Sequence, residues 1–202
     1  MKLLELFAGT GSVGKVARDM CFEVVSLDRD MAADIKLDIM DWDFQDYYPR
    51  HHFDVIWASP PCTEYSKAKT VGTRDIEGAN KVVERTLDIL EYFEPKFWIV
   101  ENPQTGLLKD QTCMYGMPFV DVDYCRYGAP YRKRTRLWNN VVKFVPHPLC
   151  TKDCGSMNDE RTKHVATAQR GSCKTDPDNS FRQDQLYQVP KELIYDMLRA
   201  TL

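Results

Sequence analysis

Cys62 follows two prolines at the end of an apolar segment, Phe53-Asp-Val-Ile-Trp-Ala-Ser-Pro-Pro-Cys62. A cysteine thiolate is the side chain best suited to add to an electron-poor carbon such as C6 of a pyrimidine, which activates C5 toward alkylation. Methylation of an exocyclic amine needs no such nucleophile. The alternative interpretation is a buried cysteine that packs as a small apolar side chain.

Three further side chains suit the same chemistry. Addition to C6 places negative charge on the ring, and an acid at N3 relieves it. Glu101 ends the apolar segment 96–100 and is the candidate for that acid, with a structural hydrogen-bonding role as its alternative. Arg134 and Arg136 are two residues apart, so on a strand they share one face and can bind a carbonyl or a phosphate together.

A glycine-rich turn lies upstream of Cys62, in Phe7-Ala-Gly-Thr-Gly-Ser12. Such a turn lets the backbone approach a ligand, although a turn without a ligand is equally compatible with it. Asp28, at the end of the next apolar segment, is placed to hold ribose hydroxyls. The turn is shorter than the dinucleotide fingerprint and lacks the lysine of a phosphate loop, which favours an adenosyl cofactor. Asp38 can accept from the adenine amino group or instead cap a helix.

Cysteine and histidine gather in the segment 146–180. Cys150 and Cys154 are separated by three residues, and His164 and Cys173 follow. Four such ligands can bind zinc tetrahedrally and organise a segment too short to build its own core. Reduced cysteines without metal are the alternative, because the spacing after Cys154 is irregular.

Strands and helices that alternate along the chain must position these side chains. We expect strands at 2–7, 23–27, 35–37, 53–58 and 96–100, a helix from the glycine turn to residue 20, and a long helix that includes residues 82–93. This order predicts a parallel sheet covered on both faces, with polar residues at one edge. Residues 146–180 show no sustained period, and a final helix is expected over 186–202, with Pro190 in its first turn.

Composition bounds the protein class. The 202 residues are 43% hydrophobic, enough for one domain with an insertion. No apolar run is long enough to span a membrane and no signal peptide is recognisable, so we expect a cytoplasmic protein, or a nuclear one in a eukaryotic host, without a membrane partner. Seven cysteines are an odd number and suggest reduced thiols.

Charge is unevenly distributed. The net charge of −3 argues weakly against nucleic acid as a partner, but no acidic residue lies between Asp123 and Asp153. The basic residues of that stretch are Arg126, Arg132, Lys133, Arg134, Arg136, Lys143 and Lys152. They predict either a phosphate-binding face or a solvated basic edge.

Four motifs together resemble the DNA (cytosine-5) methyltransferase family, in its order and spacing. They are Leu4-Glu-Leu-Phe-Ala-Gly-Thr-Gly-Ser12, Ser59-Pro-Pro-Cys-Thr-Glu-Tyr-Ser66, Glu101-Asn102 and Arg134-Thr-Arg136. The resemblance implies Cys62 as nucleophile, Glu101 at N3, and Arg134 or Arg136 on the cytosine carbonyl. It also implies S-adenosylmethionine as cofactor, bound by Phe7, Gly9, Thr10, Gly11, Ser12, Asp28, Arg29, Asp38, Ser59 and Pro60, with the C-terminal helix closing the pocket.

The chain also departs from the family pattern. Pro103 replaces the usual valine after Glu101-Asn102, Arg132 the usual glutamine before the first arginine, and Thr63 the common glutamine after the nucleophile. The region between Trp138 and the final helix is much shorter than the family's target-recognition region. Short forms of this kind resemble enzymes of phages and other viruses, with restriction-modification among the roles of the family.

We therefore expect an α/β, Rossmann-like methyltransferase fold with a mostly parallel, seven-stranded sheet. Residues 1–140 and 181–202 would form the catalytic domain, and 141–180 a small Cys/His-containing insertion. The expected substrate is duplex DNA with a flipped cytosine. An RNA substrate such as transfer RNA, or a catalytically silent cofactor-binding module, are the alternatives. A homodimer or an accessory partner would supply the missing recognition surface.

Overall fold

The computed structural model describes residues 1–168 and 183–202. Its strands are β1 (Lys2–Leu6), β2 (Glu23–Leu27), β3 (Val55–Ala58), β4 (Phe97–Pro103), β5 (Phe119–Asp123) and β6 (Arg134–Asn139). Its α-helices are α1 (Ser12–Asp19), α2 (Phe44–Tyr47), α3 (Ile76–Phe93), α4 (Gln183–Tyr187) and α5 (Lys191–Arg199). Three 3₁₀ turns are η1 (Leu108–Asp110), η2 (Thr112–Met114) and η3 (Tyr124–Tyr127).

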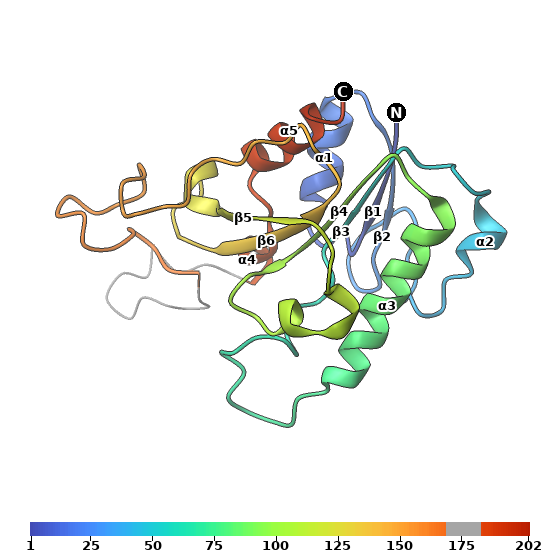
Figure 1. The fold of residues 1–202 in the computed structure, drawn as a ribbon, viewed down its shortest axis with the longest axis horizontal. Helices are drawn as coiled ribbons and strands as arrows, with labels where there is room; N and C mark the ends of the chain where they lie inside the picture. Colours follow the sequence, from blue (N-terminus) through green and yellow to red (C-terminus); the bar gives the residue numbers. More distant parts are fainter. Residues whose placement is uncertain (169–182) are drawn as a thin grey trace.

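One sheet carries all the strands of the described residues, in the order β2-β1-β3-β4-β6-β5 (Figure 1). The first four are parallel to one another, whereas β6 runs antiparallel to both β4 and β5. The α/β class and the mostly parallel sheet are as expected. Parallel strands end at the same edge, so β1, β2, β3 and β4 deliver their C-terminal residues to one place.

The expected count of seven strands is wrong for the described residues, which form six. Residues 35–37 make only a single parallel bridge, between Ile35 and Leu27. The neighbouring Asp34 carboxylate accepts from both the backbone N–H (2.9 Å) and the hydroxyl (2.7 Å) of Ser26. This side chain occupies a ladder donor of β2, so the segment does not continue as an edge strand.

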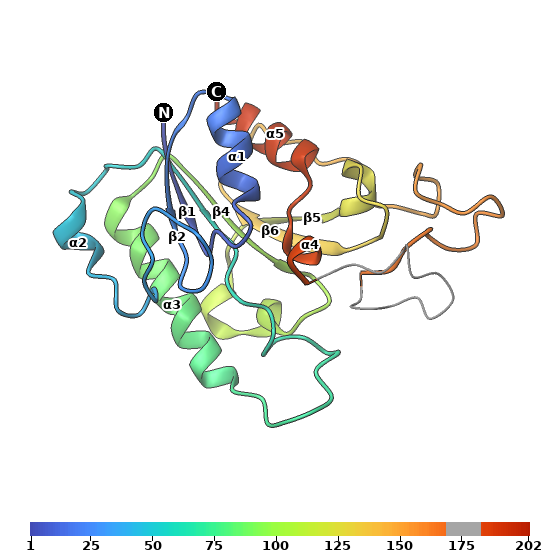
Figure 2. The ribbon, with the colours of Figure 1, turned by 180° about the vertical axis from the view of Figure 1, so that it is seen from behind.

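Two apolar cores lie on the two faces of the sheet, because alternate strand residues point to opposite sides. Leu3, Trp57 and Ile99 pack against α1 and α5 on one face. Leu4 and Val100 belong to the core under α3 on the other face. Figures 1 and 2 show α1 and α5 together on one side and α3 on the opposite side.

The C-terminal part differs from the single helix expected over 186–202. It forms two helices, α4 and α5, and Pro190 caps α5 instead of lying in its first turn. Proline has no N–H and a fixed φ, so it ends the preceding segment and starts the next helix. Between residues 140 and 168 the structure has no helix or strand beyond one antiparallel bridge, between Met157 and His164. In the described parts of the chain, no helix has the length and apolarity to cross a membrane.

Candidate active site

The glycine-rich turn leaves the sheet through three left-handed residues. Phe7, Gly9 and Gly11 have φ values of 59°, 53° and 67°. This conformation suits glycine but is rare for a bulky side chain such as Phe7, and such outliers concentrate at functional sites. The Asp28 carboxylate accepts from the Gly9 N–H (2.8 Å) and also from two backbone N–H groups of residues 30 and 31. Asp28 therefore holds the turn that it borders.

Gly14, the third glycine of this segment, lies where helix α1 packs closely against β1. A Cβ atom on Gly14 would lie 2.5 Å from the Glu5 carboxylate, which accepts hydrogen bonds from the Gly14 and Val13 N–H groups. Glu5 is buried, and burial raises its pKa to about 7 against the lowering effect of these N–H groups. Gly14 thus brings α1 close to β1.

A cavity of about 610 Å³ opens at the C-terminal ends of the parallel strands. It is lined by nine of the ten residues that the sequence assigned to the cofactor, and also by Cys62 and Glu101. These nine are Phe7, Gly9, Thr10, Ser12, Asp28, Arg29, Asp38, Ser59 and Pro60. Gly11 does not line the cavity. Because Leu27, Leu37 and Ile39 also line it, the walls are apolar between the carboxylates.

Arg29 and Asp38, two charged residues of the cavity wall, are already paired. Arg29 interacts with the carboxylates of Asp30 (3.0 Å) and Asp38 (3.2 Å). Asp38 also accepts from the Met40 N–H at 3.0 Å. The alternative considered for Asp38, a helix cap, is not found, because the contact with Met40 belongs to a turn and the next helix begins only at Phe44.

The Pro-Pro-Cys turn is held from β4. The Asn102 side-chain N–H donates to the Pro60 carbonyl (2.8 Å), and the Asn102 side-chain oxygen has no hydrogen-bond partner among the described residues. Burial raises the pKa of the Cys62 thiol, the positive charge of Lys133 opposes this, and Glu101 adds to it. A thiol of raised pKa forms the reactive thiolate only if a neighbouring positive charge or donor favours it.

Lys133 is a cavity residue that sequence reasoning placed only in the basic stretch. It lines the cavity and donates to the Leu186 carbonyl at 3.2 Å. Its ammonium lies 5.0 Å from the centre of the Tyr124 ring. The only sequence signal for this role was that Lys133 directly precedes Arg134. Because side chains alternate along a strand, Lys133 lies on the opposite face from Arg134 and Arg136.

Glu101 has a buried partner that sequence reasoning missed. The Tyr124 hydroxyl donates to Glu101 Oε1 at 2.8 Å, and Tyr124 is fully buried while Glu101 is 6% exposed. Glu101 follows Val100, which pairs with Ala58 of β3, so it lies beside the strand that leads to Cys62, as expected. No local pattern around Tyr124 indicated this contact.

The two arginines of the Arg134-Thr-Arg136 motif do not line the cavity. Arg134 forms a two-pronged ion pair with Asp123, and Arg136 forms one with Asp121. Burial acts to raise the pKa of Asp123, but the Arg134 guanidinium and the Cys150 N–H outweigh it, so the pKa is lowered. The arginines share a face of β6, and their role at the cytosine carbonyl stays a prediction.

These ion pairs also reduce the positive charge of the basic stretch between Asp123 and Asp153. Arg126 pairs with Asp153, so three of its seven cations are neutralised by acidic residues at or next to its borders. Arg132, Lys143 and Lys152 are exposed. The basic surface is therefore narrower than the sequence indicated.

The C-terminal segment closes one side of the cavity. Tyr187 and Val189 line it, and the Val189 N–H donates to the Ser12 hydroxyl at 3.3 Å. The sequence predicted that the final helix would close the cofactor pocket, but the end of α4 and its connection to α5 do so. Helix α5 lies against α1 instead.

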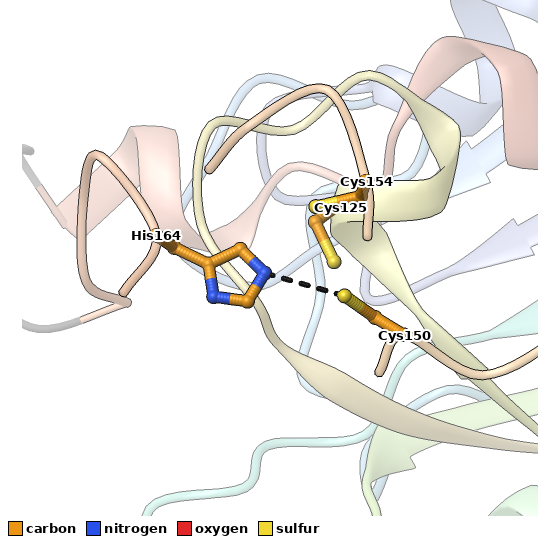
Figure 3. Close-up of side chains that lie close together, drawn as sticks. All are labelled: Cys125, Cys150, Cys154 and His164. Atoms are coloured by element: carbon orange, nitrogen blue, oxygen red, sulfur yellow. Dashed lines mark hydrogen bonds between the residues drawn. The ribbon is translucent and has the colours of Figure 1, made fainter. Parts of the chain in front are cut away.

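The metal ligands assigned from sequence come together in part. Cys150, Cys154 and His164 form a cluster with Cys125, outside the cavity (Figure 3). Cys173 lies outside the described residues. Cys125 precedes Cys150 by 25 residues and is part of no short-range motif, so only the folded chain reveals it.

Comparisons with known proteins agree with this geometry. A family model described as C-5 cytosine-specific DNA methylase matches residues 1–113. A protein of Frog virus 3 (isolate Goorha), named Probable DNA (cytosine-5)-methyltransferase, is 36% identical over 219 residues, which cover 98% of this chain and 99% of that protein. The chain belongs to the C-5 cytosine-specific DNA methylase family. Membership confirms the expected enzyme class, DNA (cytosine-5)-methyltransferase.

A solved structure shows that this methylase family member also resembles a known methyltransferase in its fold. A candidate DNA modification methyltransferase encoded within an E. coli prophage matches with a TM-score of 0.53 and 17% identity, over 74% of this chain. The chain spans only about half (52%) of that protein. The match confirms the methyltransferase fold. The family model ends at residue 113, so Tyr124, Lys133 and the cysteine cluster lie beyond it.

Proposed function

We propose that this chain transfers a methyl group from S-adenosylmethionine to C5 of a cytosine in DNA, through a covalent bond between Cys62 and C6. One observation carries the proposal. The candidate nucleophile, the candidate acid and the carboxylates suited to a nucleoside line a single cavity of about 610 Å³. Its size is within the range of small-molecule sites in enzymes.

The chemistry of the cavity wall fits the cofactor. Asp28 and Asp38 offer acceptors for ribose hydroxyls and an amino group, and apolar side chains lie between them for the adenine ring. A carboxylate oxygen that already accepts one N–H retains a second lone pair for a hydroxyl. When bound, S-adenosylmethionine supplies an electrophilic methyl group. Phe7, Gly9, Asp28, Asp38 and Ser59 are the residues that would hold it.

Cys62 and Glu101 then act on different atoms of the cytosine ring. The Cys62 thiolate adds to C6 to form an S–C6 bond, and the ring electrons move toward C5 and N3. Glu101 supports the charge at N3, and Tyr124 holds Glu101 in place by its hydrogen bond. After C5 has gained the methyl group it loses its proton to solvent, the S–C6 bond breaks, and Cys62 is released as the leaving group.

The DNA must present a flipped cytosine, because the thiol lies inside the cavity and a stacked base cannot reach it. Exposed Arg132, Lys143 and Lys152 are available for phosphates. Their number is small, so a homodimer or an accessory recognition protein would enlarge the contact with the duplex.

DNA that contains 5-fluorocytosine tests the proposal. Fluorine replaces the proton that must leave C5, so the S–C6 bond cannot break and a covalent protein–DNA adduct accumulates. We expect the adduct with the wild-type chain and S-adenosylmethionine, and none with Cys62→Ser. Cys21→Ser is the matched control, because Cys21 is exposed and does not line the cavity.

The same experiment separates the alternatives. An adduct with 5-fluorocytosine RNA but not with DNA would assign an RNA substrate. Cofactor binding without an adduct on either nucleic acid would show a silent binding module. An adduct formed by Cys62→Ser would contradict the assignment of the nucleophile.

A further inference from the structure

Three cysteines and one histidine from separate segments converge outside the candidate active site (Figure 3). Cys125 lies in η3, Cys150 and Cys154 border a short turn, and His164 is the end of the 157–164 bridge. Their sulfur atoms and a ring nitrogen all lie within 4.8 Å of one another. His164 Nε2 faces Cys150 Sγ at 3.5 Å.

This ligand set suits zinc. Three thiolates and one imidazole are typical of a tetrahedral structural site. Cys125, Cys150 and Cys154 are only 5%, 4% and 6% exposed. With four protein ligands and so little access to solvent, no coordination position is left for water or a substrate, and the site is structural in kind.

The surrounding segment needs such a centre. Between residues 145 and 165, Cys150 and Cys154 are the only buried apolar side chains. Together with Cys125 they form a small cluster separate from both cores of the sheet. A segment without an apolar core is ordered only if other bonds offset its lost conformational entropy, and metal–ligand bonds can do this.

A backbone donor lies beside one of the ligand sulfur atoms. The Lys152 N–H donates to Cys150 Sγ at 3.4 Å, from a residue with a left-handed backbone (φ 71°). A hydrogen-bond donor next to a ligand sulfur atom supports metal binding, because it orients the ligand.

Three consecutive residues connect the cluster with the candidate active site. Asp123 accepts from Arg134 (2.7 Å) and from the Cys150 N–H (2.9 Å). Tyr124 donates to Glu101 at 2.8 Å, and Cys125 is itself one of the ligands. Whatever fixes Cys125 also fixes the two residues before it.

We propose that Cys125, Cys150, Cys154 and His164 bind one zinc ion, which anchors the segment 146–164 to η3 and thereby positions Glu101 through Tyr124 and Arg134 through Asp123. The ion takes no part in the methyl transfer. The positioning of Glu101 and Arg134 matters for catalysis only if the proposed function holds, whereas the metal site does not depend on it.

Metal analysis tests the site without any activity measurement. Protein prepared under reducing, chelator-free conditions should contain one zinc per chain. Cys125→Ser, Cys150→Ser and Cys154→Ser should each lose it, whereas Cys21→Ser and Cys173→Ser should keep it. With cobalt in place of zinc, the wild-type chain should show the intense absorption of thiolate-bound tetrahedral cobalt. Absence of metal, a disulfide among the three cysteines, or loss of metal in Cys173→Ser but not in Cys125→Ser would overturn the proposal.

Removal of the zinc tests the positioning role. The zinc-depleted full-length chain should bind S-adenosylmethionine as before, because the cofactor residues lie in the segments that follow β1, β2 and β3, away from the cluster. Its kcat should fall by about tenfold or more, the scale on which supporting residues act, and zinc should restore it. An unchanged kcat would overturn the positioning role. If the wild-type chain shows no methyl transfer at all, the proposed function fails, and the metal analysis still decides the site.

Discussion

The Tyr124 hydroxyl, which is fully buried, donates a hydrogen bond of 2.8 Å to Glu101 in the wall of the cavity. Burial and the Glu101 carboxylate together raise the pKa of Tyr124 well above its ordinary value, so the tyrosine remains a donor throughout the working pH range. Glu101 is therefore oriented by a donor that does not titrate.

Tyr124→Phe removes this donor and keeps the ring. We expect kcat for methyl transfer to fall by about tenfold or more, because Glu101 loses its orientation, with little change in cofactor affinity. Steady-state kinetics and calorimetry measure the two effects. Tyr131→Phe is the control, since Tyr131 is also buried but does not line the cavity. A normal kcat in Tyr124→Phe would show that Glu101 needs no support.

Lys133→Met should move the ascending limb of the pH–rate profile, where the rate rises as the Cys62 thiol deprotonates, to higher pH. The positive charge of Lys133 lowers the pKa of Cys62 against the effect of burial, so its removal leaves less thiolate at any given pH. The measurement is kcat/KM as a function of pH. Lys133→Arg retains the charge and should keep the wild-type profile. The same displacement in Lys133→Arg would trace it to lost packing instead of lost charge.

Asp28→Ala should weaken S-adenosylmethionine binding by roughly 1.5–3 kcal/mol, the scale of hydrogen bonds to a charged acceptor. The loss has two sources, the ribose hydroxyls and the Gly9 N–H that Asp28 holds. Asp28→Asn keeps one acceptor oxygen, so its affinity for S-adenosylmethionine should lie between those of the wild-type chain and Asp28→Ala. Asp41→Ala, an exposed position outside the cavity wall, serves as the control. Unchanged calorimetric affinity in Asp28→Ala would place the ribose elsewhere.

Glu5 should make stability depend on pH. Its folded-state pKa is about 7, above the ordinary value of 4.5, so the folded chain binds the proton more tightly than the unfolded chain. Stability contributed by protonation is therefore present below pH 4.5 and is lost as the pH rises toward 7. The loss amounts to roughly 3 kcal/mol, since one pKa unit corresponds to about 1.4 kcal/mol.

Urea unfolding between pH 4.5 and 8 measures this dependence. Glu5→Gln retains an acceptor for the Gly14 N–H and removes the titration, so its free energy of unfolding should change less with pH than that of the wild-type chain. Parallel curves for the two proteins would mean that Glu5 does not titrate in this range.

Much of the fold and of the cofactor end of the site could be predicted from the sequence, because the relevant signals are local. The apolar segments that end at Phe7, Asp28, Cys62 and Glu101 report strands whose C-terminal residues must meet at one edge of a parallel sheet. The glycine turn reports a backbone that leaves the sheet in a left-handed conformation. These patterns determined which residues line one cavity.

Contacts between distant segments were decided by the tertiary structure alone. Alternation along β6 placed Arg134 and Arg136 on one face, but only the pairing of β5 with β6 brings Asp121 and Asp123 to them as partners. The fourth member of the metal cluster, Cys125, comes from a turn that no spacing rule links to Cys150. Local sequence sets the face on which a side chain lies, whereas its partner is set by how the whole chain packs, and that depends on every element together.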